Sequence, residues 1–416
     1  MVRPLLNPED ILEITTRGVT EIISQADFVR LLQSGTPLRL KMGFDPSRPD
    51  IHLGHVVGLR KLRQLQRLGH QVILIVGDWT AQIGDPTGQS ATRPQLTHEE
   101  VTSNAESYLR QFFKVVDKDL TQVVWQSEWF GKFTLADVIK LTNRFTVAQF
   151  LERDDFAKRF QEHRPIAITE FLYPLLQAYD SVVIESDVEF GGTDQMFNLL
   201  VGRQLQEMMG QTPQQCFLMP ILVGTDGVQK MSKSLGNYVA VEEPPNDMYG
   251  KLMSLPDDLI VSYLAYLTDM SSSELADASR ALASDEVNPM ELKKGLAWDI
   301  TSQFHDGSAA DDAQANFERV IQRRDIPEDI QDFSPQTQDY FRDAGKRISN
   351  LMVDASLASS TSEAKRLINQ GAVQLISETT GETRTLERDH PLPDLNPQNR
   401  CILKVGRRRF VRLVDA

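Results

Sequence analysis

The sequence predicts an α/β protein in which a parallel β-sheet domain is followed by a helical region and a small α+β domain. Three observations support this prediction. Apolar runs of strand length alternate with helical periods up to about residue 240, which is typical of βαβ units. From about 246 to 325 the pattern becomes helical and polar, and the remaining chain returns to short strand-like and helical segments. A length of 416 residues fits two or three domains.

Composition excludes several classes of protein. The apolar share of 41% and the charged share of 25% are those of an ordinary globular protein. The two cysteines, Cys216 and Cys401, lie far apart, so neither a disulfide framework nor a Cys/His zinc site is expected, and a reducing compartment fits. No apolar run approaches the roughly 20 residues of a membrane span, and the N-terminus lacks a long apolar signal segment. We therefore expect a cytoplasmic protein that binds no membrane and has no metal site of its own.

Charge is unevenly distributed along the chain. The net charge of −14 argues against a nucleic-acid partner. From Ser349 onward, however, ten Lys/Arg face eight Asp/Glu, a net of +2, so the rest of the chain carries −16. The run Arg407–Arg409 gathers basic residues in this tail. An acidic body with a locally basic tail keeps an RNA partner open, and a solvated surface strand is the alternative.

The first elements of the sheet domain follow from hydrophobic periodicity. Residues up to about 35 are predicted to be helical and peripheral, and the apolar run at 37–46 is predicted to be a strand. Leucines recur every three residues from 59 to 68, and Gly69 closes that helix. The run Q-V-I-L-I-V-G-D at 71–78 is typical of a strand buried on both faces of a parallel sheet. Strand, loop, helix and strand in this order form a βαβ unit.

The alternation continues beyond this unit. Residues 181–192, S-V-V-I-E-S-D-V-E-F-G-G, are predicted to form a strand, residues 193–209 a helix, and residues 216–224, C-F-L-M-P-I-L-V-G, another buried strand. Within the helical region, S-S-S-E-L at 271–275 is a plausible helix start.

The stretch P-D-I-H-L-G-H-V-V-G, Pro49–Gly58, puts two histidines three residues apart at the start of the first sheet-domain helix. Phosphates bind at this turn of a βαβ unit, because free N–H groups and the positive helix end meet there. His52 and His55 share a helix face, and Gly54 lets a ligand approach the backbone. A metal would need further ligands, which the neighbouring sequence does not offer. Ordinary capping and packing is the remaining alternative.

A second motif, K-M-S-K-S at Lys230–Ser234, follows the last predicted strand of the sheet. Two lysines three residues apart can clamp a polyphosphate, although a lysine pair on a loop is ordinarily a solvated turn. Parallel strands end at the same edge of a sheet, so we expect both motifs to face one crevice. Together the two motifs favour nucleotide binding.

A polar stripe lies on a later predicted helix. Tyr173, Gln177 and Asp180 are spaced to share one face, and Pro174 is expected in the first turn of that helix or at a kink. Stripes of this spacing usually pack in the core. Core stripes are rarely made of these residue types, because burying unpaired polar groups is costly. A ligand with complementary polar ends is therefore favoured.

The motif H-L-G-H followed by K-M-S-K-S resembles the paired motifs of class I aminoacyl-tRNA synthetases. K-M-G-F-D-P, I-G-D-P-T-G, Y-P-L-L-Q-A-Y-D and E-F-G-G-T-D-Q together resemble the bacterial tyrosyl-tRNA synthetases over roughly residues 35–240. L-A-S-S-T-S-E-A-K-R-L-I-N-Q-G-A-V resembles an S4-type RNA-binding domain. The resemblance implies a Rossmann-like catalytic domain at 1–240, a helical anticodon-side domain at 241–325, a linker at 326–348 and an S4-like RNA-binding domain at 349–416.

The resemblance also implies an activity, that of a tyrosine–tRNA ligase. The carboxylate of L-tyrosine attacks the α-phosphate of ATP, giving tyrosyl-adenylate and pyrophosphate, and the tyrosyl group then passes to the 3′ end of tRNA(Tyr). Such chemistry needs positioning and charge stabilisation more than covalent help from the protein. Mg²⁺ is expected with the nucleotide, and a homodimer is expected from the family. The catalytic residues implied are His52, His55, Lys230 and Lys233.

Site residues are carried over at the positions that match the family's motifs. The ATP-binding positions are Gly43, Asp45, His52, Gly54, His55, Gly191, Gly192, Asp194, Lys230, Met231, Ser232, Lys233 and Ser234. The tyrosine-binding positions are Lys41, Asp85, Tyr173, Gln177, Asp180 and Gln195. The RNA-binding positions are Lys365, Arg366, Arg407, Arg408 and Arg409, with Phe410 as a stacking residue. Asp180 is expected to accept from the phenol, whereas Tyr173, Gln177 and Asp85 receive the ammonium.

Lys41 departs from the family pattern, because many members have a tyrosine there that helps to hold the phenol. The lysine either reaches the phenol oxygen or points elsewhere. Three other functions stay open. A tryptophanyl ligase shares both motifs, but Asp180 favours a phenol. A nucleotidyltransferase would not need K-M-S-K-S. An inactive synthetase-derived RNA-binding protein would not need the four catalytic residues.

Overall fold

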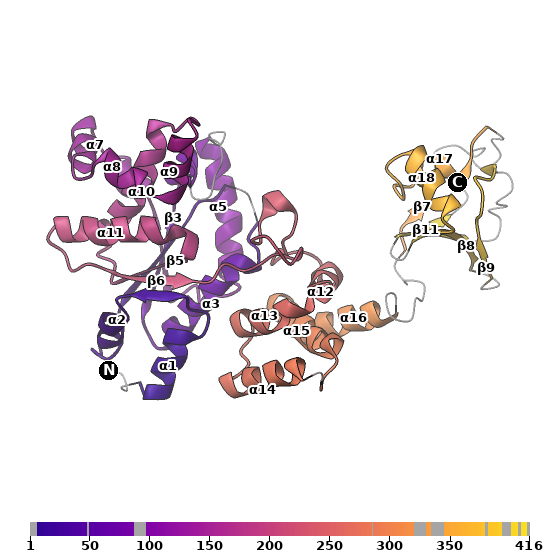
Figure 1. Cartoon of the computed structure of the whole chain (residues 1–416), viewed down its shortest axis with the longest axis horizontal. Helices are drawn as coiled ribbons and strands as arrows, with labels where there is room; N and C mark the ends of the chain where they lie inside the picture. The colour runs from indigo at the N-terminus through magenta and orange to yellow at the C-terminus, as the bar shows by residue number, and fades with distance from the viewer. Residues whose placement is uncertain are drawn as a thin grey trace. The chain divides into compact units, whose positions relative to one another are not determined.

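The structure is a computed structural model, and two compact units, 1–310 and 311–416, make up the chain (Figure 1). Each unit is described by itself. The residues that the structure describes are 6–47, 50–86, 97–284, 286–319, 330–333, 345–378, 382–392, 401–406 and 409–413.

A six-stranded sheet in the order β1-β6-β5-β2-β3-β4 forms the centre of the first unit. Its strands are β1 (Glu21–Ile23), β2 (Arg39–Phe44), β3 (Gln71–Val76), β4 (Thr121–Trp125), β5 (Val188–Gly192) and β6 (Gln215–Met219). Strands β2 to β6 pair in parallel, which confirms the predicted parallel sheet, and β1 pairs with β6 antiparallel. From β2 the chain continues to β3 and β4 on one side of that strand, and it later returns to form β5 and β6 on the other side of β2. Ligands bind at such a switch point in doubly wound sheets.

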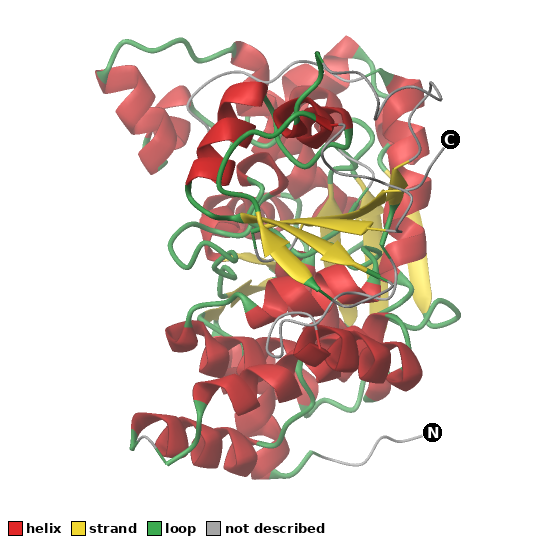
Figure 2. Cartoon of the chain, turned by 90° about the vertical axis from the view of Figure 1, so that its right-hand side faces the viewer, coloured by secondary structure: helices red, strands yellow, loops and turns green. Residues whose placement is uncertain are grey.

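Helices separate the strands of this sheet along the chain; Figure 2 colours the strands yellow and the helices red. Up to residue 208 they are α1 (Pro8–Thr16), α2 (Gln25–Leu32), α3 (Leu53–Arg67), α4 (Thr80–Ile83), α5 (His98–Phe112), α6 (Ser127–Phe130), α7 (Leu135–Thr142), α8 (Val147–Leu151), α9 (Asp154–Gln161), α10 (Ile168–Val183), the 3₁₀ turn η1 (Thr193–Gln195) and α11 (Met196–Met208). The periodic leucines of α3 are fully buried up to Leu65, as is β3 from Val72 to Val76. The predicted βαβ unit is thus confirmed, and its apolar residues form the core.

Three predicted elements differ from the structure. The first 35 residues are not all helical, because residues 21–23 pair with β6 as an edge strand. The predicted strand at 181–192 begins only at Val188, because residues 181–183 complete α10, which packs against α11. The strand predicted to reach 224 ends at Met219, and Pro220 follows, which has no N–H to donate to a sheet.

Pro174 was predicted in the first turn of its helix or at a kink, and it instead lies in the interior of α10. The helix continues on both sides of it from Ile168 to Val183. A proline at this place removes one helical hydrogen bond, which packing of α10 must offset.

The helices after residue 230 complete the first unit and lead into the second (Figure 1). They are η2 (Lys233–Leu235), α12 (Pro245–Met253), η3 (Asp257–Leu259), α13 (Ile260–Leu267), α14 (Ser272–Ala283), α15 (Pro289–Phe304) and α16 (Gly307–Phe317). The predicted start at 271–275 is confirmed, because Ser271 caps α14 and forms a capping box with Glu274. No helix in the described ranges is long and apolar enough to cross a membrane.

The second unit contains a five-stranded sheet in the order β7-β11-β10-β8-β9. Its elements are β7 (Asp332–Phe333), α17 (Ile348–Asp354), α18 (Thr361–Asn369), β8 (Val373–Ser377), β9 (Thr383–Thr385), β10 (Cys401–Val405) and β11 (Arg409–Leu413). The two helices pack on the sheet around Leu351, Ile368 and Leu403. Strand β7 lies in the segment predicted to be a linker, and it pairs in parallel with β11. Part of that segment therefore belongs to the folded unit.

Candidate active site

A cleft of about 1040 Å³ opens where β2, β5 and β6 end. Met42 and Asp45 line it from the end of β2, and Gly192 lines it from the end of β5. The first motif contributes His52, Gly54 and His55, and the second contributes all of Lys230–Ser234; these residues share the same cavity. The prediction that both motifs face one crevice is confirmed. Pro49, the first residue of the quoted stretch, lies outside the described residues.

The two histidines cap the N-terminus of α3 and line the cleft at the same time. His52 Nδ1 accepts a hydrogen bond from the Gly54 N–H at 3.2 Å, and His55 Nδ1 accepts one from the His52 N–H at 3.2 Å. A neutral imidazole that accepts at Nδ1 carries its proton on Nε2. Each ring therefore has an N–H donor left for a ligand. The capping alternative is realised, and both rings also line the cleft.

Both imidazoles are neutral in this environment. Burial, followed by the positive charge of Lys233, lowers the pKa of His55 to about 4. Burial and the neighbouring His55 hold the pKa of His52 far below its usual range. The ring centroids lie 4.1 Å apart, so two charges at this separation would repel each other. Hydrogen-bond donation, and not a formal positive charge, is what this pair offers to an anion.

The K-M-S-K-S loop is held in place by Asn237. The Ser232 N–H donates to Asn237 Oδ1 at 2.8 Å, and Asn237 Nδ2 donates to the Lys230 carbonyl at 3.1 Å and to Asp226 Oδ2 at 2.8 Å. The buried side chain of Met231 anchors the loop in the protein. The Leu53 N–H donates a hydrogen bond to the Val239 carbonyl at 3.0 Å, which connects the chain after the K-M-S-K-S loop to the first motif.

The two motif lysines have different surroundings. Lys230 Nζ pairs with Asp194 Oδ2 at 3.1 Å, so two of the predicted ATP-binding residues contact each other. Lys233 Nζ lies 3.4 Å from the Tyr108 hydroxyl and 5.0 Å from the centre of its ring. Ser232 and Ser234 share a hydrogen bond of 2.9 Å between their hydroxyls. A polyphosphate entering the cleft would therefore meet both lysines and two hydroxyls.

Asp180 is buried on α10 and accepts two hydrogen bonds. Gln126 Nε2 donates to Oδ2 at 2.8 Å, and Trp129 Nε1 donates to Oδ1 at 3.2 Å. Gln126 Oε1 accepts from the Thr80 N–H at 3.0 Å, which fixes its amide so that the NH₂ group faces Asp180. Burial raises the pKa of Asp180 to about 7, against the opposing charge of Lys41. A carboxylate has about four acceptor positions, so Asp180 can still accept from a ligand hydroxyl.

Tyr173 on α10 contacts Asp45, which lines the cleft. Its hydroxyl donates to Asp45 Oδ2 at 2.9 Å, and Thr80 Oγ1 donates to Asp45 Oδ1 at 2.7 Å. Burial, then the charges of Asp45 and Asp85, raise the pKa of Tyr173 well above its usual value, so the phenol keeps its proton. The predicted ATP residue Asp45 and the predicted tyrosine residues Tyr173 and Asp85 are therefore neighbours in one polar network.

Lys41 does not lie where the resemblance put it. Its side chain is 0% exposed, and Nζ forms an ion pair with Glu189 Oε1 at 2.8 Å. The same ammonium donates to the Gln177 carbonyl at 2.7 Å and to Ser181 Oγ at 2.6 Å. All three N–H donors are used inside the protein. The sequence left two directions open for Lys41, toward the phenol or elsewhere. Its side chain points toward Glu189, because the pairing of β2 with β5 puts the two residues opposite each other.

Glu189, the partner of Lys41, also orients the side chain of Gln177. Its Nε2 donates to Glu189 Oε1 at 3.0 Å, so its Oε1 must point away from that carboxylate. This oxygen is buried and accepts no hydrogen bond from the described residues. A buried acceptor without a donor is costly unless a ligand supplies one. An ammonium group is such a ligand.

Glycines border the cleft at the end of β5. A Cβ on Gly191 would lie 3.0 Å from Gln195 Oε1, and a Cβ on Gly192 would lie 2.7 Å from Asp194 Oδ1. Gln195 Oε1 accepts from the Gly192 N–H at 3.2 Å. Larger residues would displace the two polar side chains predicted to contact substrate. Gly43, also predicted to bind ATP, is exposed near the end of β2.

The predicted RNA-binding residues lie on the second unit. Lys365 and Arg366 are exposed on α18. Arg409 donates to the Leu357 carbonyl and lies 3.6 Å from Glu363, so it is engaged within its own unit. Phe410 is partly buried, with Lys404 Nζ 5.4 Å from its ring centre. Arg407 and Arg408 lie outside the described residues.

Sequence reasoning missed several residues that shape the site: Tyr108, Gln126, Trp129, Glu189 and Asn237. Gln126 directly follows β4, whose T-Q-V-V-W pattern ends at the same edge as the motif-bearing strands. That position at a strand end was a usable signal. The others are brought in by tertiary packing.

In this sheet, parallel strands are followed by an H-x-G-H segment and a K-M-S-K-S segment, and both segments line one cleft. This arrangement defines a class I aminoacyl-tRNA synthetase. The family model described as "tRNA synthetases class I (W and Y)" matches residues 33–322, and the chain belongs to this family. The tyrosine–tRNA ligase of Dehalococcoides mccartyi (strain CBDB1) is 55% identical over 404 residues, which cover 97% of this chain and 98% of that protein.

Other relatives agree with this assignment. The tyrosine–tRNA ligase of Thermotoga maritima is 48% identical over 409 residues and covers 98% of each chain. Among solved structures, the tyrosyl-tRNA synthetase from Archaeoglobus fulgidus complexed with L-tyrosine has a TM-score of 0.61 at 24% identity, over 74% of this chain and 99% of that chain. This last likeness supports the fold alone.

Proposed function

We propose that the chain is a tyrosine–tRNA ligase. It activates L-tyrosine with ATP to tyrosyl-adenylate and pyrophosphate, and it transfers the tyrosyl group to the 3′ end of tRNA(Tyr). The observation that carries the proposal is the shared cleft of the two phosphate-binding motifs, next to the polar network that joins Asp45 to Tyr173. The relatives named tyrosine–tRNA ligase support the choice of amino acid.

The residues of the cleft act by positioning and charge. The tyrosine carboxylate is itself the nucleophile, so no side-chain nucleophile or base is needed for the first step. His52 and His55 donate N–H groups to phosphate oxygens as charge develops, and Lys230 and Lys233 neutralise the departing pyrophosphate. One such donor is worth roughly 10²- to 10³-fold in rate. Mg²⁺ enters with the nucleotide as part of the substrate.

The choice of tyrosine rests on polar groups at both ends of the substrate. Asp180 accepts from the phenol hydroxyl, while Gln177 Oε1, Tyr173 and Asp85 receive the ammonium. A site that hydrogen-bonds a hydroxyl rejects an analogue that lacks it, because its own buried polar group is then left unpaired. A tryptophanyl ligase is the second candidate, since the family model covers both amino acids. An indole N–H can also donate to Asp180, as that of Trp129 does, so the preference for tyrosine over tryptophan rests on the relatives named tyrosine–tRNA ligase.

The remaining partners complete the proposal. The second unit binds tRNA(Tyr) through Lys365 and Arg366 on α18 and through its further basic residues at 407–409. Apolar side chains exposed on α7 to α10 suit a homodimer interface. They are Leu135, Ile139, Val147, Phe160 and Ile168. Both cysteines are free and buried, which suits a cytoplasmic location.

Amino-acid-dependent exchange of labelled pyrophosphate into ATP tests the function. We expect exchange with L-tyrosine and at most a trace with L-tryptophan. Faster exchange with tryptophan would make the chain a tryptophanyl ligase. Exchange with neither, in a sample that unfolds cooperatively, would overturn the proposal and leave the inactive RNA-binding protein or another nucleotidyltransferase.

A further inference from the structure

A second cavity, of about 220 Å³, lies between α1, α3 and the segment that follows α13. Five cationic side chains line it: Arg17, Arg60, Lys61, Arg63 and Arg67. Two carboxylates, Glu13 and Asp269, also line it, so the formal excess is three positive charges. This excess is unusual on a chain whose net charge is −14. The cavity shares one lining residue, Val57, with the nucleotide cleft.

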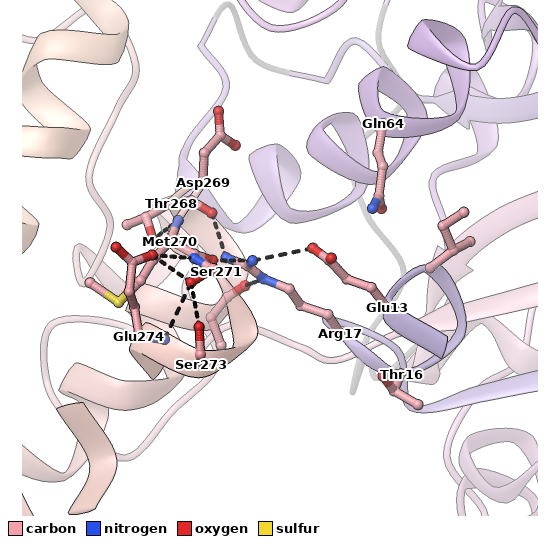
Figure 3. Close-up of polar contacts among 12 residues, drawn as sticks. Glu13, Thr16, Arg17, Gln64, Thr268, Asp269, Met270, Ser271, Ser273 and Glu274 are labelled. Atoms are coloured by element: carbon pink, nitrogen blue, oxygen red, sulfur yellow. Dashed lines mark hydrogen bonds and ion pairs between the residues drawn. The ribbon is translucent and has the colours of Figure 1, made fainter. Parts of the chain in front are cut away.

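Arg17 has a structural role in this cavity. Figure 3 shows its guanidinium reaching from the end of α1 to the backbone that follows α13, and a dashed line joins it to the Glu13 carboxylate, 3.5 Å away. It donates to the carbonyls of Ala265 at 3.0 Å and Thr268 at 2.7 Å, and to that of Met270. These acceptors satisfy its donors, so Arg17 holds α1 to α13 and contributes only its charge to a ligand.

The other cations are only partly neutralised. Asp269 accepts from Arg60 and from Arg63, the latter at 3.2 Å, and the charge of Asp299 acts on the same two guanidiniums, while Arg60 also donates to Gln303 Oε1 at 2.5 Å. Lys61 Nζ is buried and donates only to neutral oxygens, the Ile14 carbonyl at 3.1 Å and Gln64 Oε1 at 2.8 Å. Arg67 is exposed and has neither an ion pair nor a hydrogen bond within the described ranges.

The local titration behaviour agrees with an excess of positive charge. Burial, then the charge of Arg17, lowers the pKa of Lys61 to about 7. Although burial opposes the effect, the charges of Arg60, Arg63 and Arg67 hold the pKa of Asp269 below its usual value. An anion in the cavity would raise the pKa of Lys61 toward its usual range, and its binding is therefore coupled to protonation of this lysine.

We infer that this basic pocket, formed by Arg60, Lys61, Arg63 and Arg67 around Asp269, binds a phosphate group. Guanidiniums offer paired N–H donors that match phosphate oxygens, and a buried ammonium adds a point charge. The volume is about a fifth of the nucleotide cleft, which suits a single phosphate and not a whole nucleotide. That phosphate is either part of an RNA backbone, which rests on the proposed function, or a free ion.

The test uses the full-length protein with Arg63→Gln and Arg67→Gln combined. Both side chains reach solvent, so the fold should tolerate their replacement. The matched control is Arg30→Gln on α2, whose side chain is 78% exposed and pairs with Asp27 at 2.8 Å. It removes one arginine charge far along the sequence from the basic pocket.

The first measurement replaces chloride with inorganic phosphate at constant low ionic strength and follows the thermal midpoint. Phosphate bound in the nucleotide cleft stabilises all three proteins alike, so differences between them isolate the basic pocket. The second measurement is the KM for tRNA(Tyr) in charging, with pyrophosphate exchange as the control. Loss of a backbone contact should raise this KM and reduce the slope of its logarithm against log salt by about one to two, without slowing exchange.

The two measurements distinguish the sources of the phosphate. If the double variant loses phosphate stabilisation but keeps its KM for tRNA, the pocket binds free phosphate. If its KM for tRNA rises while the Arg30→Gln control matches the parent, the pocket binds RNA backbone. If neither quantity differs from the parent, or if Arg30→Gln changes both equally, the inference is wrong. Failure of pyrophosphate exchange in the parent would instead refute the proposed function.

Discussion

Replacement of Lys41 by methionine should destabilise the first unit severely. The side chains of Lys41 and Glu189 are 0% and 1% exposed, and their charged atoms lie 2.8 Å apart. Methionine nearly fills the volume of the lysine but leaves the Glu189 carboxylate buried without its counter-ion. Amides of Gln177 and Gln214 still donate to it, but they carry no charge. Breaking a buried pair in this way costs about 3–5 kcal/mol.

Urea denaturation followed by tryptophan fluorescence measures this cost. All four tryptophans, at 79, 125, 129 and 298, belong to the first unit, so the signal reports that unit and not the second. This avoids the difficulty that a chain of two units need not unfold in one step. The matched control is Arg110→Met, because Arg110 pairs with Glu242 at 2.9 Å but is 63% exposed. An exposed pair of this kind contributes little to stability, because solvent screens it.

A double variant separates charge from packing. Lys41→Met combined with Glu189→Gln removes both charges while it keeps the shapes of the side chains, so it should recover most of the stability lost in Lys41→Met alone. The reasoning fails if Lys41→Met shifts the urea midpoint no further than Arg110→Met does. It also fails if the double variant is as unstable as the single one, because the loss would then come from packing.

Three further results are expected. His55→Ala should slow tyrosine-dependent pyrophosphate exchange by roughly 10²- to 10³-fold, because one phosphate donor is lost, whereas loss of its capping hydrogen bond should lower the free energy of unfolding by only about 0.5–1.5 kcal/mol; an equal rate would remove its catalytic role. Because burial raises the pKa of Asp180 to about 7, the folded chain holds this proton more tightly than the unfolded chain. The stability of the parent relative to Asp180→Asn should therefore fall as the pH rises from about 4 to 7, and a flat difference in urea midpoints would contradict this. Truncation after residue 348 should leave exchange intact and impair charging of tRNA(Tyr); unimpaired charging would exclude an RNA-binding role for the second unit.

The parts of the fold and site that sequence could predict are local or follow from strand direction. The histidine pair occupies the N-terminal turn of α3, and the lysine pair follows a buried strand. Parallel strands end at one edge, so two motifs that follow such strands had to meet. The polar face of α10 was predicted in the same way, because a helical period is visible in a short window.

The contacts between these pieces could not be predicted in this way. Tyr173 donates to Asp45, 128 residues earlier in the chain, and Gln126 donates to Asp180 from the end of a strand that shows no strong apolar run. The short edge strand at 21–23 contains the β-branched residues Ile22 and Ile23, but three residues are too few for a periodic pattern, and the strand depends on its partner in β6. Each of these features is decided by pairing or packing with a distant segment, which a local pattern does not record.

The position of Lys41 depends both on a local sequence pattern and on pairing with a distant strand. Strand pairing aligns it with Glu189 across the parallel strands β2 and β5, and each is the one buried charge of its strand, since Arg39 at the start of β2 is only partly buried. A lysine at the centre of a buried strand is costly unless a carboxylate meets it. Opposite charges buried in two strands of one sheet therefore indicate each other, and they indicate that the strands are neighbours. The pairing of β2 with β5 and the inward direction of Lys41 are thus both consistent with the sequence, although Arg39 in the same strand leaves the choice of the buried cation to the pleat of the sheet.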